Sequence, residues 1–251
     1  MADETHPVSR ETETSLDTPP VPSAARGVFR DRLGLAEQYA DLLAGDGVLR
    51  GLIGPREVPR LWARHLLNCA VVAELVPDEA TVADIGTGAG LPGLVLAIAR
   101  PDLRVTLVEP LLRRSTFLEE AVAALGLDVE VVRARAEELH GERSFAVVTS
   151  RAVAPLDRLL SWSLPLAETG GVVLAMKGSS AGAEIESARG GLRRLGGGEP
   201  SVHVCGDGIL DPPTTVVRVE AVRDPALGWV DATREPSGRR APRRSRRRKG
   251  A

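Results

Sequence analysis

The stretch ADIGTGAGLPG, residues 83–93, decides the fold of this chain. It follows a short β-branched run at Thr81–Ile85 and opens a helical stretch over Pro92–Arg100. Four glycines in eight residues leave a turn without side chains, so a ligand can lie against the backbone while the helix N-terminus presents free N–H groups. A strand, such a turn and a helix in succession predict an α/β domain with a ligand site at the turn.

Short β-branched runs alternate with helical stretches on both sides of this turn, which predicts a parallel sheet covered by helices on both faces. The strands are expected at Thr81–Ile85, Arg104–Val108, Val129–Val132, Phe145–Thr149, Val172–Ala175, Ser201–Val204 and Thr214–Ala221. The helices are expected at Pro92–Arg100, Leu112–Leu125, Leu156–Pro165 and Ala181–Leu195. Because the last two strands have no helix between them, the final strand is expected to be antiparallel to its neighbour. That ending favours the Rossmann-like fold of methyltransferases that use S-adenosylmethionine over the dehydrogenase version.

Composition divides the chain into segments. Residues 1–26 are acidic and rich in Pro, Ser and Thr, which predicts a disordered leader. Residues 27–77 form a helical segment, with amphipathic helices expected at Phe29–Leu43 and Val58–Val76. Residues 78–223 form the predicted S-adenosylmethionine-dependent domain, and the Arg-rich residues 234–251 are expected to be a disordered tail.

The bulk composition excludes several classes of protein. With 251 residues, 43% of them hydrophobic, the chain can bury a sizeable core. It has no apolar run long enough for a membrane span and no secretory signal. Its two cysteines, Cys69 and Cys205, stand far apart, so neither a disulfide framework nor a metal site is expected. A cytoplasmic protein without a metal follows from these features.

The glycine-rich turn is compatible with two kinds of nucleoside ligand. Gly88, Gly90 and Gly93 spell the GxGxxG pattern of dinucleotide sites, but that match alone is weak. The additional Gly86 and the preceding Asp84 favour S-adenosylmethionine, because such an aspartate can orient the loop and approach the ammonium of the methionine part. A tight turn without any ligand is the plain alternative, and the density of glycines argues against it.

Two acidic residues follow the next strands. Glu109 ends the second strand, where a carboxylate can accept hydrogen bonds from both ribose hydroxyls of a bound nucleoside. Past the third strand, the backbone of Ala136 or Glu137 could meet an adenine edge, and the Glu137 carboxylate could accept from its amino group. A solvated acid at a strand end, or one favoured by a helix dipole, is the alternative for each.

Several separated motifs together resemble the RsmG/GidB family of bacterial 16S ribosomal RNA methyltransferases. The resemblance covers roughly residues 49–222. The motifs are Arg64–Asn68, Asp84–Gly93, Arg113–Leu118, Ala136–Glu137, Ser150–Ala152 and Met176–Gly178. One departure is Asn68-Cys69, where many relatives carry Asp-Ser, so these two residues receive no catalytic weight here.

The resemblance implies transfer of a methyl group from S-adenosylmethionine to N7 of a guanosine in the 530-loop region of 16S ribosomal RNA. It implies that Gly86 and Leu91 contact the cofactor and that Ala136 and Glu137 flank its adenine. It places Arg151 at the mouth of the site. The implied partner is 16S ribosomal RNA or the small ribosomal subunit, and we expect a monomer.

The candidate catalytic residues are Arg151, Lys177 and His65, which together with Arg64 would hold the target guanosine and its phosphates. Arg151 follows the fourth strand, where substrate meets cofactor in this fold. The alternatives are an ion pair of Arg151 with Asp84 or Glu109 and a packed core position for His65. Guanine N7 carries a lone pair and no hydrogen, so positioning is expected to suffice without a general base.

Other functions remain open from the sequence. An NAD-linked oxidoreductase explains the glycines and Glu109, but leaves the Leu-Pro-Gly sequence and the antiparallel ending unexplained. A non-catalytic RNA-binding module on a methyltransferase-like fold would not need the intact turn and ribose acid. A small-molecule methyltransferase is the third possibility, and the basic tail favours RNA over it.

Charge is segregated toward the C-terminus. Residues 234–251 hold nine Lys/Arg and one Glu, a formal charge of +8 in a chain whose net charge is −2. Such a polycation binds RNA phosphates through counterion release, and without aromatic residues it contributes affinity rather than sequence choice.

Deleting residues 234–251 is therefore expected to weaken RNA binding and to lower its salt dependence while sparing cofactor binding. The measurement is the slope of log K against log salt for 16S RNA, with the full chain as reference. An unchanged slope would contradict the prediction.

Overall fold

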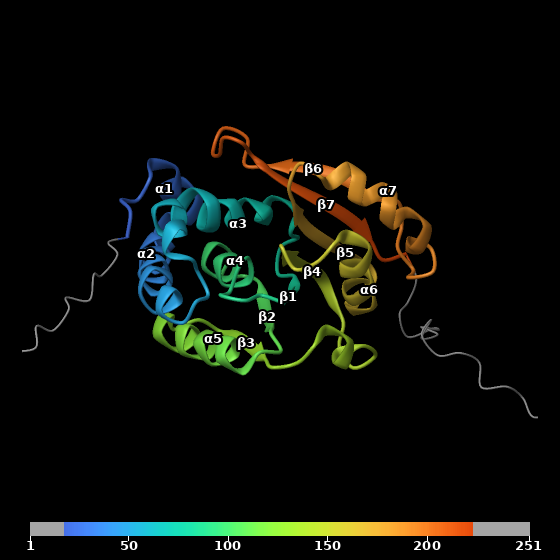
Figure 1. The fold of residues 1–251 in the computed structure, drawn as a ribbon, viewed down its shortest axis with the longest axis horizontal. Coiled ribbons are helices and arrows are strands. Elements are labelled where there is room, and N and C mark those ends of the chain that lie inside the picture. Colours follow the sequence, from blue (N-terminus) through green and yellow to red (C-terminus); the bar gives the residue numbers. More distant parts are fainter. Residues whose placement is uncertain (1–17, 223–251) are drawn as a thin grey trace, which may run out of the picture.

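The computed structural model describes residues 18–222 as one seven-stranded sheet with helices on both faces (Figure 1). The strands are β1 (Thr81–Ile85), β2 (Arg104–Val108), β3 (Val129–Val132), β4 (Phe145–Arg151), β5 (Ala167–Lys177), β6 (Ser201–Cys205) and β7 (Thr214–Glu220). The α-helices are α1 (Ser23–Phe29), α2 (Leu33–Leu42), α3 (Asn68–Ala70), α4 (Gly93–Ala99), α5 (Leu112–Leu125), α6 (Leu156–Ser163) and α7 (Ala181–Leu192). The 3₁₀ and π segments are η1 (Arg30–Arg32), η2 (Leu43–Gly47), η3 (Pro55–Arg60), η4 (Leu61–Leu67), η5 (Val71–Leu75), η6 (Ala136–Leu139) and η7 (Leu164–Leu166).

The strand order is β3-β2-β1-β4-β5-β7-β6. The five strands from β3 to β5 are parallel, whereas β7 is antiparallel to both β5 and β6. The predicted antiparallel ending is therefore confirmed. The strand order reverses beside β1, and in open sheets of this kind ligands bind in the crevice at the carboxyl ends of the strands on either side of the reversal.

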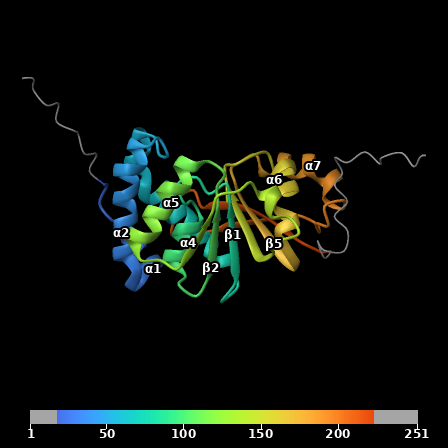
Figure 2. The same ribbon diagram turned by 90° about the horizontal axis from the view of Figure 1, so that it is seen from below.

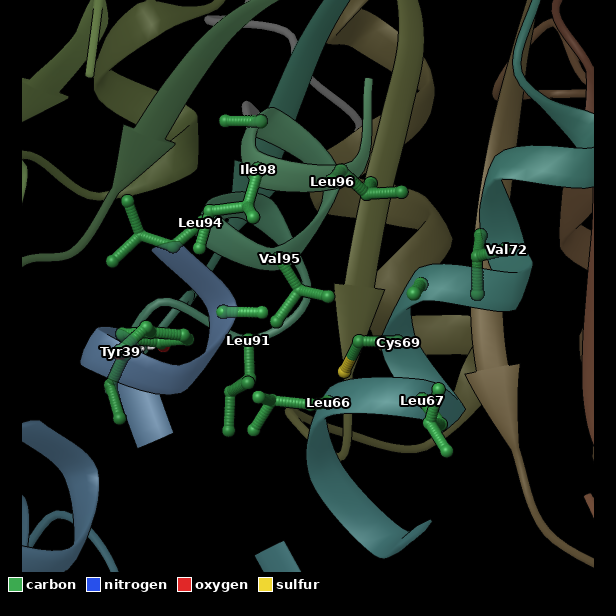
Figure 3. Packing of buried hydrophobic residues seen from close by; sticks show 14 of the residues in the cluster. Tyr39, Leu66, Leu67, Cys69, Val72, Leu91, Leu94, Val95, Leu96 and Ile98 are labelled. Atoms are coloured by element: carbon green, nitrogen blue, oxygen red, sulfur yellow. Dashed lines mark hydrogen bonds between the residues drawn. The ribbon is translucent and has the colours of Figure 1, made fainter. Parts of the chain in front are cut away.

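Two apolar layers enclose the sheet. The N-terminal helices, α4 and α5 cover one face, and α6 and α7 cover the other (Figure 2). β1 is buried on both faces, as expected for a central parallel strand. The N-terminal segment packs on α4 and on the turn before it, where Leu66 lies beside Leu91 and Tyr39 lies near Leu94 (Figure 3). The helical segment before β1 thus belongs to the same core as the sheet.

The N-terminal segment departs from the expected pattern in three ways. Helix α1 starts at Ser23, and Trp62 donates from Nε1 to the Pro19 carbonyl at 3.0 Å, so residues 18–26 are ordered although a disordered leader was expected there. Arg30, with φ of +51°, separates α1 from α2 within the predicted first helix. The predicted second helix is a succession of η3, η4, α3 and η5. Pro59 lies inside η3, where it removes a backbone donor from a regular α-helix.

The remaining elements lie close to their expected positions. Helix α4 begins at Gly93, with Pro92 at its N-cap rather than inside its first turn. Strand β5 begins at Ala167, earlier than expected, since the exposed residues 168–170 (Glu, Thr, Gly) interrupt the apolar signal after Ala167. Residues 1–17 of the expected leader and the whole expected tail, 234–251, lie outside the described residues.

Gly93 is a position where the packing of the sheet admits no side chain. A Cβ there would lie 2.3 Å from Leu107 Cδ2 and 2.9 Å from Asp84 Cβ. Gly190 in α7 provides the opposite case, because its Cβ would meet nothing within 4 Å.

We expect Gly93→Ala to lower the free energy of unfolding by about 1–3 kcal/mol through overpacking. Gly190→Ala, the matched control, should raise it by about 0.5–1 kcal/mol, since alanine is the better helix former. Urea titrations of both variants measure whether each substitution lowers or raises the free energy of unfolding. Equal stability of Gly93→Ala and the unmodified chain would contradict the tight packing at this position.

Candidate functional site

A cavity of about 670 Å³ opens at the carboxyl ends of β1, β2 and β4. Its wall is formed by the loops that follow these strands and β3, by Trp162 of α6, and by Leu52, Ile53 and His65 of the N-terminal segment. Of the residues predicted to bind the cofactor, all except Asp84 and Gly90 lie on this wall. The cavity therefore occupies the crevice that the sheet topology predicts.

The glycine-rich turn forms the floor of this cavity. Gly86, Gly88 and Gly90 all have positive φ, between +61° and +99°. A Cβ at Gly88 would meet only the Gly86 carbonyl oxygen, at 3.9 Å, so the backbone here is open to a ligand. Gly90 is crowded instead, because a Cβ would lie 2.5 Å from Leu94 Cδ1 and 2.8 Å from the Tyr39 hydroxyl. Gly88 and Leu91 line the cavity, and Gly90 shapes the turn behind it.

Asp84 holds the turn from below. Its Oδ2 accepts hydrogen bonds from Thr87 Oγ1 at 2.5 Å and from the Gly93 N–H at 2.7 Å. The residue is fully buried, and within residues 18–222 its Oδ1 has no hydrogen-bond partner. Asp84 is thus bound to both ends of the loop, but it lies beneath the loop and not on the cavity wall.

Burial raises the pKa of Asp84 from 3.8 to about 7, since the charged form is poorly solvated there. The hydrogen bonds from Thr87 and Gly93 and the charge of Arg151 oppose this shift, and the nearby Glu109 adds to it. A cationic ligand in the neighbouring cavity would favour the ionised form of Asp84.

Glu109 stands on the cavity wall immediately after β2. Its Oε2 accepts from the Gly88 N–H at 3.1 Å and its Oε1 from the Leu111 N–H at 3.1 Å, while Arg114 lies 3.6 Å from Oε2. Only 2% of the side chain is exposed. Each carboxylate oxygen retains a lone pair, so Glu109 has acceptor capacity left for ligand hydroxyls.

The wall beyond β3 carries Ala136, which is buried, and Glu137, which is exposed, at the start of η6. The same cavity holds a pair that the sequence analysis missed. Trp162 lines the cavity, and the Arg158 guanidinium lies 5.0 Å from the centre of its ring. The residues belong to an ordinary amphipathic helix, α6, and only the fold turns them toward the cavity.

Arg151 ends β4 and is held by two residues from the helical segment. Its Nη2 lies 2.6 Å from His65 Nδ1, and its Nη1 donates to Cys69 Sγ at 3.2 Å. Within residues 18–222 no carboxylate forms an ion pair with Arg151, so the alternative of a pair with Asp84 or Glu109 is not realised. The structure thus brings the candidates Arg151 and His65 together.

A second cavity, of about 570 Å³, adjoins the first and shares Arg151, Ala152 and Val153 with it. Arg64 and Lys177 line it as well. Lys177 does not contact Arg151: its ammonium donates to Glu184 Oε2 and to the Ala154 carbonyl, both at 2.7 Å. The charge of Lys177 is therefore largely compensated within the protein.

Asn68 and Cys69, which received no weight from the sequence, both belong to this region. Asn68 Nδ2 donates to Thr214 Oγ1 at 2.7 Å on the wall of the second cavity. Cys69 is fully buried beneath Arg151. In the sequence, their place in this region was indicated by their position shortly after Arg64 and His65.

Over the described part of the chain, no group of three or more His, Cys, Asp or Glu residues is placed to hold a metal ion. No helix between residues 18 and 222 is both long and apolar enough to cross a membrane.

The strand order, the open glycine turn and the carboxylate after β2 together define a class: the Rossmann-like methyltransferases that use S-adenosylmethionine. The S-adenosylmethionine-dependent O-methyltransferase of Thermotoga maritima shares this fold, with a TM-score of 0.50 and 15% identity over 62% of this chain and 65% of that one. A side-chain-free floor with the Glu109 carboxylate beside it fits a cofactor that carries an amino acid and a ribose.

The family follows from the sequence matches. The GidB model, rRNA small subunit methyltransferase G, matches residues 32–210, and the chain belongs to this family. The ribosomal RNA small subunit methyltransferase G of a Nocardioides species is 63% identical over 229 residues, which are 90% of this chain and 92% of that protein. That of Salinispora tropica is 57% identical over 235 residues, 89% of this chain and 97% of that protein. The resemblance inferred from the motifs is confirmed, and an NAD-linked oxidoreductase is excluded.

Asp84 should make stability depend on pH. Below pH 3.8 both folded and unfolded chains carry its proton; as the pH rises to about 7, the unfolded chain loses this proton first, so the contribution of Asp84 to stability falls and is lost above that pH. We expect the stability difference between the unmodified chain and Asp84→Asn, from urea titrations, to decline through this window.

Asp102→Asn is the control, because a hydrogen bond from Arg100 lowers the pKa of Asp102. Its contribution is present above the ordinary carboxylate pKa and is lost only at more acidic pH, so the corresponding difference should stay level between about pH 5 and 7. A level difference for Asp84→Asn as well would contradict the raised pKa.

Proposed function

We propose that this protein transfers the methyl group of S-adenosylmethionine to N7 of a guanosine in 16S ribosomal RNA. The observation that carries the proposal is the position of Arg151 on the wall shared by the two cavities, where its hydrogen-bond partners within residues 18–222 are the neutral His65 and Cys69. One cavity has the features of a cofactor site, and at the other Arg151 and the exposed Arg64 can face an RNA nucleotide.

The groups around Arg151 are poor bases. A guanidinium has no acceptor, His65 Nδ1 already faces Arg151, and burial raises the pKa of the Cys69 thiol. Such surroundings suit an acceptor atom that needs no deprotonation. Guanine N7 is one, because its in-plane lone pair can take the methyl group directly and the positive charge then passes to the purine ring.

The cofactor supplies an activated methyl group on a sulfonium sulfur. In our proposal Gly86, Gly88 and Leu91 face its amino acid and ribose parts, with Gly90 and Asp84 fixing the shape of the turn. Glu109 accepts from the ribose hydroxyls. A further group of residues, Ala136, Glu137 and Trp162, encloses the adenine.

Arg151 holds the target guanosine in this arrangement. Its guanidinium keeps two donors in a fixed fork and is not neutralised by a carboxylate, which suits a phosphate or a base oxygen. Arg64, whose side chain is 59% exposed, adds charge at the second cavity. Lys177 contributes differently from our first expectation, because its bonds to Glu184 and Ala154 hold the loop after β4.

The finer features of the substrate and assembly also belong to the proposal. We infer a cytoplasmic monomer that acts on naked 16S RNA or on the assembled small subunit. Tritiated methyl transfer onto naked RNA, small subunits and whole ribosomes, followed by mapping of the modified nucleotide, distinguishes these substrates. Light scattering measures the oligomeric state.

Arg151→Ala should lower methyl transfer by roughly 100-fold or more, since the acceptor loses its positioning group, while binding of S-adenosylhomocysteine by calorimetry stays near normal. Arg151→Lys keeps the charge but loses the forked pair of donors, so its rate of methyl transfer should remain well below that of the unmodified enzyme. Arg193→Ala, an exposed position at the end of α7, is the control and should be fully active. Full activity of Arg151→Ala, or methylation of a different base atom, would overturn the proposal.

A further inference from the structure

A chain of three polar side chains leads from the protein surface to the junction of the two cavities. Glu57 Oε2 lies 3.1 Å from His65 Nε2, and His65 Nδ1 lies 2.6 Å from Arg151 Nη2. Glu57 and His65 come from η3 and η4, whereas Arg151 ends β4, 86 residues further along the sequence than His65. Glu57 has no described contact with either cavity.

The donors and acceptors of this chain fix the protonation state of His65. A guanidinium can only donate, so His65 Nδ1 must accept and cannot carry a proton. The ring proton therefore lies on Nε2 and is donated to the Glu57 carboxylate. Burial and the charge of Arg151 lower the pKa of His65 to about 4, which keeps the ring neutral at physiological pH.

Neutral partners leave the charge of Arg151 available. His65 and Cys69 fix both terminal nitrogens of the guanidinium without forming an ion pair. A carboxylate in the place of His65 would orient Arg151 equally well but would also neutralise it. The imidazole keeps the anionic Glu57 one ring away and transmits only orientation.

We propose that Glu57 is a positioning residue for methyl transfer: it holds His65 in the Nε2–H tautomer, and His65 in turn fixes the fork of Arg151 toward the acceptor nucleotide. This inference rests on the proposed function for the role of Arg151. It assigns His65 to positioning rather than to contact with the RNA.

Glu57 also has a second partner, and an effect through that partner must be distinguished from the positioning of His65. Arg64 Nε lies 3.1 Å from the same Glu57 oxygen, so Glu57 could matter only by holding Arg64. Arg64 is exposed at the second cavity, and its displacement would weaken RNA binding and raise KM. Displacement of Arg151 acts on the reacting geometry and lowers kcat.

The kinetic test compares Glu57→Ala with Glu57→Gln in the full chain, with the RNA substrate that the unmodified enzyme methylates and saturating S-adenosylmethionine. The alanine variant should lose roughly 10- to 100-fold in kcat with binding of S-adenosylhomocysteine within about twofold of normal. The glutamine variant should recover most of this loss, because its amide oxygen can still accept from Nε2–H.

The tautomer is measured directly by ¹⁵N NMR of the imidazole nitrogens, with the signals of His65 among the four histidines assigned from a His65→Asn variant. The unmodified protein should show a neutral Nε2–H ring at pH 7, and Glu57→Ala should shift population toward the Nδ1–H form. This measurement is independent of the RNA substrate. If no form of 16S RNA is methylated, the proposed function fails while the tautomer result still stands or falls by itself.

Three outcomes would overturn the positioning role. One is an Nδ1–H or protonated His65 in the unmodified protein at pH 7. Another is an effect of Glu57→Ala on KM for RNA alone, which would assign Glu57 to Arg64. The third is a Glu57→Gln variant as slow as Glu57→Ala, since a retained hydrogen bond would then give no rescue.

Discussion

The bonds that Asp84 makes beneath the glycine turn are the constraint on which the site depends. Its Oδ2 accepts hydrogen bonds from both Thr87 Oγ1 and the Gly93 N–H, and these bonds connect the end of β1 to the start of α4. These two bonds hold the turn in a shape that leaves Gly88 open to the cavity. The aspartate is fully buried, and water cannot replace either bond.

The same turn is fixed from its other side by the helical segment. Tyr39 of α2 is fully buried and donates its hydroxyl to the Ala89 carbonyl at 2.6 Å. Leu52 and Ile53 extend this segment onto the cavity wall, and His65 and Cys69 reach Arg151. The residues before β1 are therefore part of the site, and not an appendage to a complete sheet domain.

Sequence reasoning located the features that are encoded by residues close together along the chain. The turn at 83–93 and Glu109 were recognisable because strand, turn and acid occur in order along the chain, and β1, β2 and β3 have the expected bounds. The contact of His65 with Arg151 joins residues 86 positions apart, and no local pattern encodes it. Helix α1 was missed because Ser23–Phe29 is short and follows prolines, and its stability comes from Ala25 and Phe29 buried in the core.

The acidic and basic groups of the site occupy separate positions. Glu109 lies on the wall of the first cavity, where it accepts from two backbone N–H groups and faces Arg114, and Asp84 lies beneath the turn, bound to Thr87 and Gly93. Arg151 lies at the edge of the first cavity, where neutral His65 and Cys69 hold it and a polyanion would approach. A direct pair between Arg151 and either acid would cancel both fields. The helical segment offers Arg151 an imidazole and a thiol in place of either acid, so the charge of Arg151 retains its attraction for an anionic ligand.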